Sequence, residues 1–148
     1  MIPDAALVWI VQLLFLMGDV QVFVFMRTDC PAANRSAPEL RRIATEFQGK
    51  HVAFYLVYTD PNENKRAIEN HMAEFQFPGT PMRDPNHQLQ ERSHATMVPE
   101  AAVFDPGGSL KYRGRIGDLK DAISAVVGRK PIAHPETSVT GCPLNDHK

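Results

Sequence analysis

The 148-residue chain has room for a single domain with one substantial core. Its composition, 43% hydrophobic and 22% charged, is that of an ordinary globular protein. The formal charge is −1, and Lys and Arg are spread along the chain rather than gathered in a block. These charges give no electrostatic basis for binding nucleic acid or an acidic membrane, so we expect no nucleic-acid partner.

The N-terminal region is strongly apolar. Residues 5–17 are apolar apart from Gln12, but they are too few for a transmembrane helix, which needs about twenty, so we expect no integral membrane span. Their number suits the hydrophobic part of a signal peptide, yet the leader carries Asp4 and no Lys or Arg. Residues 1–18 are therefore either an export remnant or a buried strand or helix of the domain. Localisation stays open, and only the export reading favours an extracytoplasmic (periplasmic) compartment over the cytoplasm.

The first half of the chain predicts two strands and two helices. Residues 20–26 are a nearly continuous apolar run of β-branched and aromatic residues, which predicts a strand buried on both faces. Apolar residues at helical spacing then predict a helix from residue 31 to about residue 47. Residues 51–58 predict a second buried strand. A second helix follows the turn at residues 59–62 and runs to about residue 75, with His71 on its inward side.

The second half begins with a proline-rich stretch, which predicts loops and one short helix around residues 88–94. Strands follow at residues 101–104 and 109–112, joined by the Asp-Pro-Gly-Gly turn at residues 105–108. An amphipathic helix over residues 118–127 ends the periodic pattern.

These elements follow the order β-α-β-α-β-β-α. Right-handed crossovers make the first two strands parallel, and the hairpin adds an antiparallel edge. This is the thioredoxin topology, so we expect an α/β fold with a central mixed β-sheet and helices on both faces. We expect the domain to span residues 1–128, and the proline-containing segment 129–148 to be an irregular tail.

The two cysteines, Cys30 and Cys142, are too few for a disulfide scaffold. None of the six histidines has the spacing or the Cys-x-x-Cys companion of a zinc site, so we expect neither metal nor cofactor. A metal carrier is a further hypothesis for the function of the chain, beside the two given at the end of this subsection. Copper carriers with this topology place two cysteines close together, which this sequence lacks.

Cys30 stands where the first strand passes into the first helix. Backbone N–H groups at a helix start stabilise a thiolate and lower its pKa from about 8.5, and Pro31 suits the first helical position. Asp29 opposes this shift by like-charge repulsion, which Arg27 or Arg35 offsets if its side chain points inward. The alternative is an inert, buried structural cysteine.

Three segments resemble a known family. Residues 23–40 are similar to the strand, active-site cysteine and proline-kinked helix of redoxins. Residues 97–101 occupy the place of their cis-proline loop. Residues 103–108 and 112–116 match the hairpin and its exit. Over about residues 20–127 the chain therefore resembles redoxins of the peroxiredoxin (AhpC/TSA) and thiol–disulfide oxidoreductase group.

The active-site residues depart from both branches of that group. Thioredoxins have a second cysteine at the position of Ala33, and an aromatic residue before the first cysteine. Peroxiredoxins have Thr or Ser at the position of Arg27. The look-alikes nearest in pattern carry a late Gly-Cys-Pro-like segment, which residues 141–143 match.

The resemblance implies a set of site residues around Cys30. It implies that Pro99 is a cis proline that leaves the backbone of Val98 free to pair with a substrate strand; the alternative is an ordinary loop proline. The residues expected to contact substrate are Thr28, Asp29, Pro31 and Val98.

Without a cysteine at position 33, a mixed disulfide on Cys30 has no local partner. An external thiol resolves it, Cys142 resolves it, or Cys30 has no redox role. The long loop adds only a logarithmic entropy cost to a Cys30–Cys142 pair, but a disulfide also needs close, directed side chains. These three alternatives stay open at the level of sequence.

We expect a thiol-dependent oxidoreductase that acts through Cys30. Disulfide exchange is favoured over peroxide reduction because the peroxidatic Thr is missing, and the expected partner is a thiol/disulfide protein or a small-thiol reductant. The alternative is a catalytically weak thioredoxin-fold binding module that docks a peptide or partner at the Pro99 loop.

Overall fold

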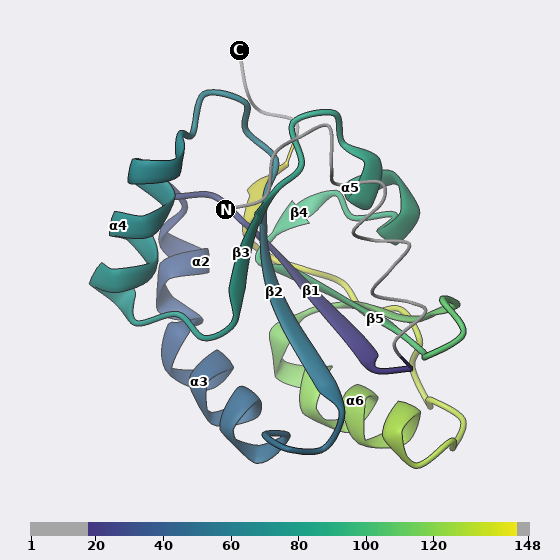
Figure 1. Ribbon diagram of the computed structural model, residues 1–148. Coiled ribbons are helices and arrows are strands. Elements are labelled where there is room, and N and C mark those ends of the chain that lie inside the picture. The colour runs from purple at the N-terminus through teal and green to yellow at the C-terminus, as the bar shows by residue number, and fades with distance from the viewer. Residues whose placement is uncertain (1–17, 145–148) are drawn as a thin grey trace.

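The structure, a computed structural model, describes residues 18–144. Its centre is a five-stranded mixed sheet in the order β3-β2-β1-β5-β6 (Figure 1). The strands are β1 (Val20–Met26), β2 (Val52–Tyr58), β3 (Thr80–Arg83), β5 (Glu100–Phe104) and β6 (Leu110–Gly114). The first three are mutually parallel, and β5 runs antiparallel to both β1 and β6. The predicted thioredoxin-like α/β fold with a mixed sheet is confirmed.

Strand β1 is the centre of the core, and all seven of its residues are buried. This burial explains its nearly continuous apolar sequence, which only Gln21 interrupts, because a strand covered on both faces has no solvent side. The Phe23 ring stacks on Tyr55 of β2, with centroids 5.4 Å apart, and meets Phe104 of β5 edge-on at 5.7 Å. The core therefore holds the end of β1, where Cys30 follows, in a fixed place.

Helices lie on both faces of the sheet, as predicted. They are α2 (Pro31–Arg35), α3 (Ala37–Glu46), α4 (Lys65–Phe75), α5 (Gln88–Ser93) and α6 (Leu119–Val127), the last preceded by a 3-10 turn (Ile116–Asp118). Tyr55 and Tyr58 are three positions apart on β2, so their side chains point to opposite faces. His71 of α4 contacts Tyr58, whereas Arg92 of α5 lies over Phe104 on the face of Tyr55.

The continuous helix predicted for residues 31–47 is wrong in one respect, because it breaks at Ser36 into α2 and α3. Pro38 has no N–H to donate to the carbonyl four residues earlier, which interrupts the helical ladder. The Ser36 hydroxyl instead donates to the Ala33 carbonyl at 2.6 Å. The later strand β6 also differs from prediction, at residues 110–114 instead of 109–112, because Asp105 accepts the Ser109 N–H and lengthens the turn.

The expectation of loops in the proline-rich stretch is wrong for residues 80–83, which form β3. Pro81 lies within this strand, and its missing N–H is tolerated because β3 is the edge of the sheet. The short helix expected around residues 88–94 is present as α5.

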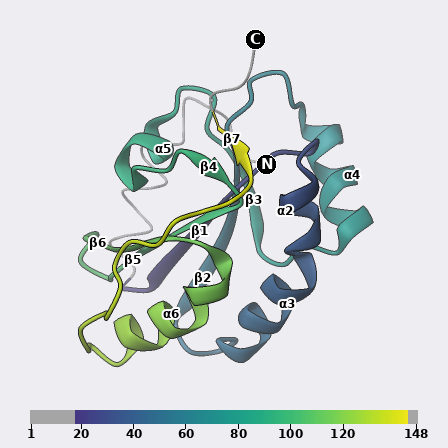
Figure 2. The ribbon, with the colours of Figure 1, turned by 180° about the vertical axis from the view of Figure 1, so that it is seen from behind.

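The tail is irregular over most of its length, but it is attached to the domain at two places. The Tyr112 hydroxyl and Thr137 Oγ1 are 2.8 Å apart, and strand β7 (Cys142–Pro143) pairs antiparallel with β4 (Met97–Val98). Figure 2 shows the tail in yellow returning along the molecule to β4. The prediction of an irregular tail misses this pairing, and the boundary at residue 128 stays a prediction.

The apolar segment 1–17 lies outside the described residues. Among the helices within residues 18–144, none combines the length and the apolar character that crossing a membrane requires.

Candidate functional site at the end of strand β1

Cys30 lies at the junction that the sequence predicts, in the N-cap position of α2. It is fully buried, with 0% of its surface exposed. Its carbonyl accepts the Asn34 N–H at 3.1 Å, which closes the first turn of the helix, and Pro31 lies in that turn. Strand β1 and helix α2 therefore fix the backbone on both sides of the sulfur.

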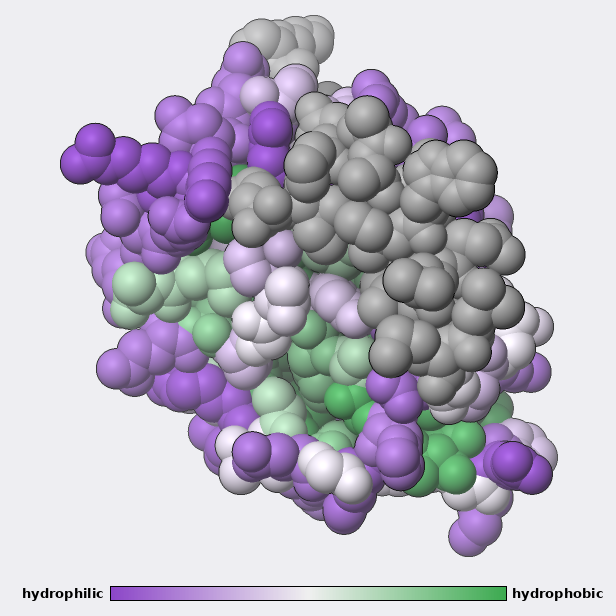
Figure 3. Space-filling model, in the orientation of Figure 1, coloured by the Kyte–Doolittle hydropathy of each residue, from purple (hydrophilic) through white to green (hydrophobic). Residues whose placement is uncertain are grey.

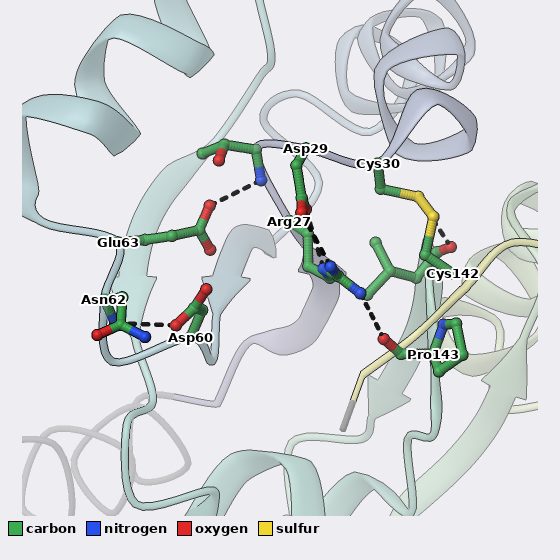
Figure 4. Close-up of polar contacts among 10 residues, drawn as sticks. Arg27, Asp29, Cys30, Asp60, Asn62, Glu63, Cys142 and Pro143 are labelled. Carbon is green, nitrogen blue, oxygen red and sulfur yellow. Dashed lines mark hydrogen bonds and ion pairs between the residues drawn. A yellow bond between two sulfur atoms is a disulfide. The ribbon is translucent and has the colours of Figure 1, made fainter. Parts of the chain in front are cut away.

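Cys30 and Cys142 form a disulfide (Figure 4). Their Cα atoms are 6.1 Å apart, a normal separation for a disulfide, although 112 positions separate them in the sequence. The structure therefore brings the two cysteines together, and the role of Cys142 as a resolving thiol stays a prediction.

The proline loop faces the same sulfur. The Val98–Pro99 peptide bond is cis, as the resemblance implies. The Val98 carbonyl oxygen lies 3.6 Å from the Cys30 Sγ, and in the thiol form it would accept the S–H. In this disulfide form the Val98 backbone pairs with Cys142 of the chain's own tail, and its pairing with a substrate strand stays a prediction.

The tail strand lies close beside the loop at Gly141 and at Leu144. A Cβ on Gly141 would overlap the Val98 carbonyl, so only glycine lets the two backbones approach this closely. The Leu144 N–H donates to the Thr96 carbonyl at 2.9 Å, and its side chain is fully buried. The β4 side is fixed in turn by Glu100, whose carboxylate accepts the N–H groups of Thr96 and Met97 at 2.7 and 3.0 Å.

Arg27 links the segment just before Cys30 to the residue that follows Cys142. Its Nε and Nη2 donate to the two carboxylate oxygens of Asp29 at 3.0 and 2.9 Å, and its Nη1 donates to the Pro143 carbonyl at 2.8 Å. In Figure 4 the guanidinium lies between Asp29 and Pro143. Arg27, one of the two arginines that could offset the Asp29 charge, therefore pairs directly with that carboxylate.

A buried carboxylate supports the loop before Cys30. One oxygen of Glu63 accepts the Thr28 N–H at 2.7 Å, while its other oxygen is buried without a hydrogen-bond partner. Burial raises the pKa of Glu63, and the hydrogen bond from Thr28 opposes that rise. Of the expected substrate-contacting residues on this loop, Asp29 and Pro31 are exposed and Thr28 is half-buried.

A hydrogen-bonded chain behind α2 connects it to α4 and β2. The Tyr58 hydroxyl lies 2.9 Å from His71 Nδ1, and His71 Nε2 lies 2.6 Å from Asn34 Oδ1. Burial lowers the pKa of His71, which favours the neutral ring at physiological pH. His71 is inward, as its helical spacing predicts.

Sequence reasoning missed Glu63 and the contact of Arg27 with the tail. Glu63 follows a turn motif that turn formation alone explains, so nothing in the sequence marks it. Arg27 stands out as a departure from the peroxiredoxin pattern, but its partner is 116 positions away. Within residues 18–144, no three His, Cys, Asp or Glu side chains are grouped to hold a metal ion.

A thioredoxin-like sheet with a cysteine pair beside a cis-proline loop defines a thioredoxin-fold redox protein. The sequence matches the AhpC/TSA family over residues 10–113, and the chain belongs to this family. No curated protein matches the sequence.

Solved structures share the fold at low sequence identity. An uncharacterized conserved protein from Geobacillus kaustophilus is 19% identical with a TM-score of 0.75, over 86% of this chain and 77% of that one. A secreted Mycobacterium tuberculosis disulfide oxidoreductase homologous to E. coli DsbE is 19% identical with a TM-score of 0.60, over 74% and 84%. A thiol:disulfide interchange protein from Chlorobium tepidum is 16% identical with a TM-score of 0.63, over 76% and 83%.

Proposed function

We propose that the chain is a thiol–disulfide oxidoreductase that cycles between a Cys30/Cys142 dithiol and the corresponding disulfide. The observation that carries the proposal is the bond between these two cysteines beside the cis Val98–Pro99 peptide. The names of two similar structures, a disulfide oxidoreductase and a thiol:disulfide interchange protein, support the same chemistry.

The proposed reaction has two exchange steps. In the reduced protein the Cys30 thiolate attacks a substrate disulfide, forms a mixed disulfide with one substrate sulfur and releases the other as a thiolate. The Cys142 thiolate then attacks the Cys30 sulfur, which releases the second substrate thiolate and leaves the Cys30–Cys142 disulfide. The substrate gains two electrons, and an external dithiol protein or two small-thiol molecules return the pair to the dithiol.

Disulfide exchange fits the site better than peroxide reduction. Arg27 stands where a peroxidase has Thr or Ser, and three of its N–H groups donate to Asp29 and to the Pro143 carbonyl. These contacts direct the guanidinium to the tail, whereas a peroxidase needs a donor aimed at the peroxide. The partners we propose are accordingly a thiol/disulfide protein or a small-thiol reductant.

The test is the reactivity of Cys30 in a Cys142→Ala variant. We expect alkylation of Cys30 to follow an apparent pKa below about 7.5, and a small disulfide such as 2-hydroxyethyl disulfide to form a mixed disulfide with it. Reduced wild-type protein treated in the same way should instead yield the Cys30–Cys142 bond. A thiol that reacts with neither reagent in the folded variant contradicts the proposal and favours the peptide-binding module.

A further inference from the structure

A pocket of about 840 Å³ lies at the end of the sheet opposite the redox site. Strand β1 leads to Cys30 at its C-terminal end, whereas Val20, the first residue of the strand, lines this pocket. The turn before β2, the β5–β6 hairpin and the segment after α6 form the other walls, at the lower right of Figure 1. Small-molecule sites have volumes of about 300–1,000 Å³, so the pocket is large enough for such a ligand.

The floor of the pocket is apolar. Val20 and Val126 are buried there, and Ile132 packs against the same core from the segment after α6. Val127 lines the pocket too, and it is the one large hydrophobic side chain among residues 18–144 that is exposed, at 40%. Figure 3 shows green, hydrophobic side chains at this end of α6 with purple, hydrophilic side chains beside them. An apolar group bound here would remove that hydrophobic surface from water.

Basic side chains surround this apolar floor. Lys50, Lys111, Arg129 and Lys130 line the pocket from three separate segments, and Asp105 is the only acidic residue among its described lining residues. The Lys111 Nζ lies 3.7 Å from Asp105 Oδ2, so these two charges offset each other. Within the described part of the chain, neither Arg129 nor Lys130 forms an ion pair. The pocket therefore carries an excess of positive charge.

Arg129 occupies a backbone position that favours glycine. Helix α6 ends in a Schellman motif, in which the Arg129 N–H donates to the Val126 carbonyl at 3.1 Å. In the same motif the Lys130 N–H donates to the Ala125 carbonyl at 2.8 Å. The φ of Arg129 is 54°, in the left-handed region where a residue with a Cβ is strained. The helix end alone therefore does not explain an arginine at this position, whereas an anionic ligand in the pocket would.

We infer that this pocket binds an amphiphilic anion, a small molecule with an apolar body and a carboxylate or phosphate head. The apolar body lies on Val126, Val127 and Ile132. The head pairs with Arg129, whose planar set of N–H donors matches a carboxylate or a phosphate, and with Lys130. A free small molecule suits this bounded pocket better than a membrane surface does, because the formal charge of −1 gives the chain no general attraction to anionic lipid. The inference is independent of the proposed redox function, since it involves neither cysteine.

The test is a titration of the full chain with decanoate, below the concentration at which decanoate forms micelles, followed by NMR of the backbone amides. We expect the amide signals of Gly107, Val127 and Arg129 to shift and to saturate with one common dissociation constant. Acetate has the head without the body, so it should bind at least about tenfold more weakly, because it buries little apolar surface. Decyl phosphate, titrated in the same way, shows which head group the pocket prefers.

Arg129→Gly separates ligand binding from the stability of the fold. The variant loses the cation but relieves the left-handed backbone, so its melting temperature should rise while its affinity for decanoate falls about fivefold. Gln76→Gly is the matched control, because Gln76 has a φ of 55° at the end of α4, is exposed and lies outside the pocket. It should also gain stability, but it should keep the wild-type affinity for decanoate.

Two results would overturn the inference of a ligand site. One is the absence of saturable shifts at the pocket amides, and the other is an affinity for decanoate that is the same in Arg129→Gly as in the wild type. Equal affinities for acetate and decanoate would overturn the apolar body that we assign to the ligand.

Discussion

Arg27 donates a hydrogen bond to the carbonyl oxygen of Pro143, 116 positions further along the chain, with an Nη1···O distance of 2.8 Å. The side chain is only 12% exposed, and Asp29 holds its other edge in a bidentate pair. Because each cysteine lies within three positions of one end of this contact, Arg27 positions the tail for disulfide formation without touching either sulfur.

Replacing Arg27 with Gln should lower the effective concentration of the Cys142 thiol at Cys30 by about tenfold, since a charge-assisted hydrogen bond to the docked strand is lost. The measurement is the equilibrium between dithiol and disulfide in glutathione buffers, quenched by alkylation. Arg115→Gln is the matched control, because the Arg115 side chain pairs with Asp118 on the surface. An unchanged equilibrium in the Arg27 variant would show that the contact does not position the tail.

Gly141→Ala should weaken the disulfide form by about 1–3 kcal/mol through overlap with the Val98 carbonyl. The same glutathione equilibrium measures this change. Gly117→Ala serves as the control, because a Cβ at that position meets no atom within 4 Å. If both variants close their disulfide as readily as the wild type, the steric argument for glycine at position 141 fails.

The sequence predicts the parts of the site that rest on local pattern. The apolar run of β1 marks a strand buried on both faces, which places Cys30 at its end, and Pro31 marks the start of a helix. The tail contacts are different, because no periodicity relates Val98 to Cys142 or Arg27 to Pro143. Such pairings depend on the path of the whole chain, so the sequence could offer Cys142 only as one of three alternatives.

Strand β3, which was predicted as a loop, was missed for a related reason. Pro81 argues against a strand when the sequence is read locally, and only the position of β3 at the sheet edge removes the objection. Glu63 likewise has no periodic signature, because its role depends on one backbone N–H, that of Thr28.

The contribution of His71 should lower the free energy of unfolding as the pH falls through about 6.5, the ordinary pKa of histidine. Burial lowers the pKa of His71 in the folded state. Below about pH 6.5 the unfolded chain therefore binds a proton at this residue more tightly than the folded chain does, which favours unfolding. The measurement is the difference in unfolding free energy between the wild type and His71→Gln, obtained by urea unfolding from pH 7.5 to pH 5. As the pH falls this difference should shift against the wild type, while the contribution of Glu63, present in both proteins, cancels. His51→Gln is the control, since the His51 side chain is 88% exposed, and it should keep the wild-type pH dependence.

Glu63 should change the pH dependence of stability in the direction opposite to that of His71. Its folded-state pKa is raised by burial above the ordinary value of 4.5, so the folded chain holds its proton more tightly than the unfolded chain. The contribution of Glu63 to stability therefore falls as the pH rises from about 4.5 through the raised pKa, and it is constant above that range.

Glu63→Gln keeps an oxygen that can accept the Thr28 N–H but cannot ionise, so it should gain stability relative to the wild type as the pH rises through that window. The measurement is the difference in unfolding free energy between the two proteins from pH 4 to pH 7. Burial also raises the pKa of Asp84, but this residue is present in both proteins, so its contribution cancels in the difference. Glu69→Gln is the control, because the Glu69 side chain is 56% exposed. If this difference does not change with pH, ionisation of the buried Glu63 carboxylate does not lower the stability of the folded state, and the prediction is wrong.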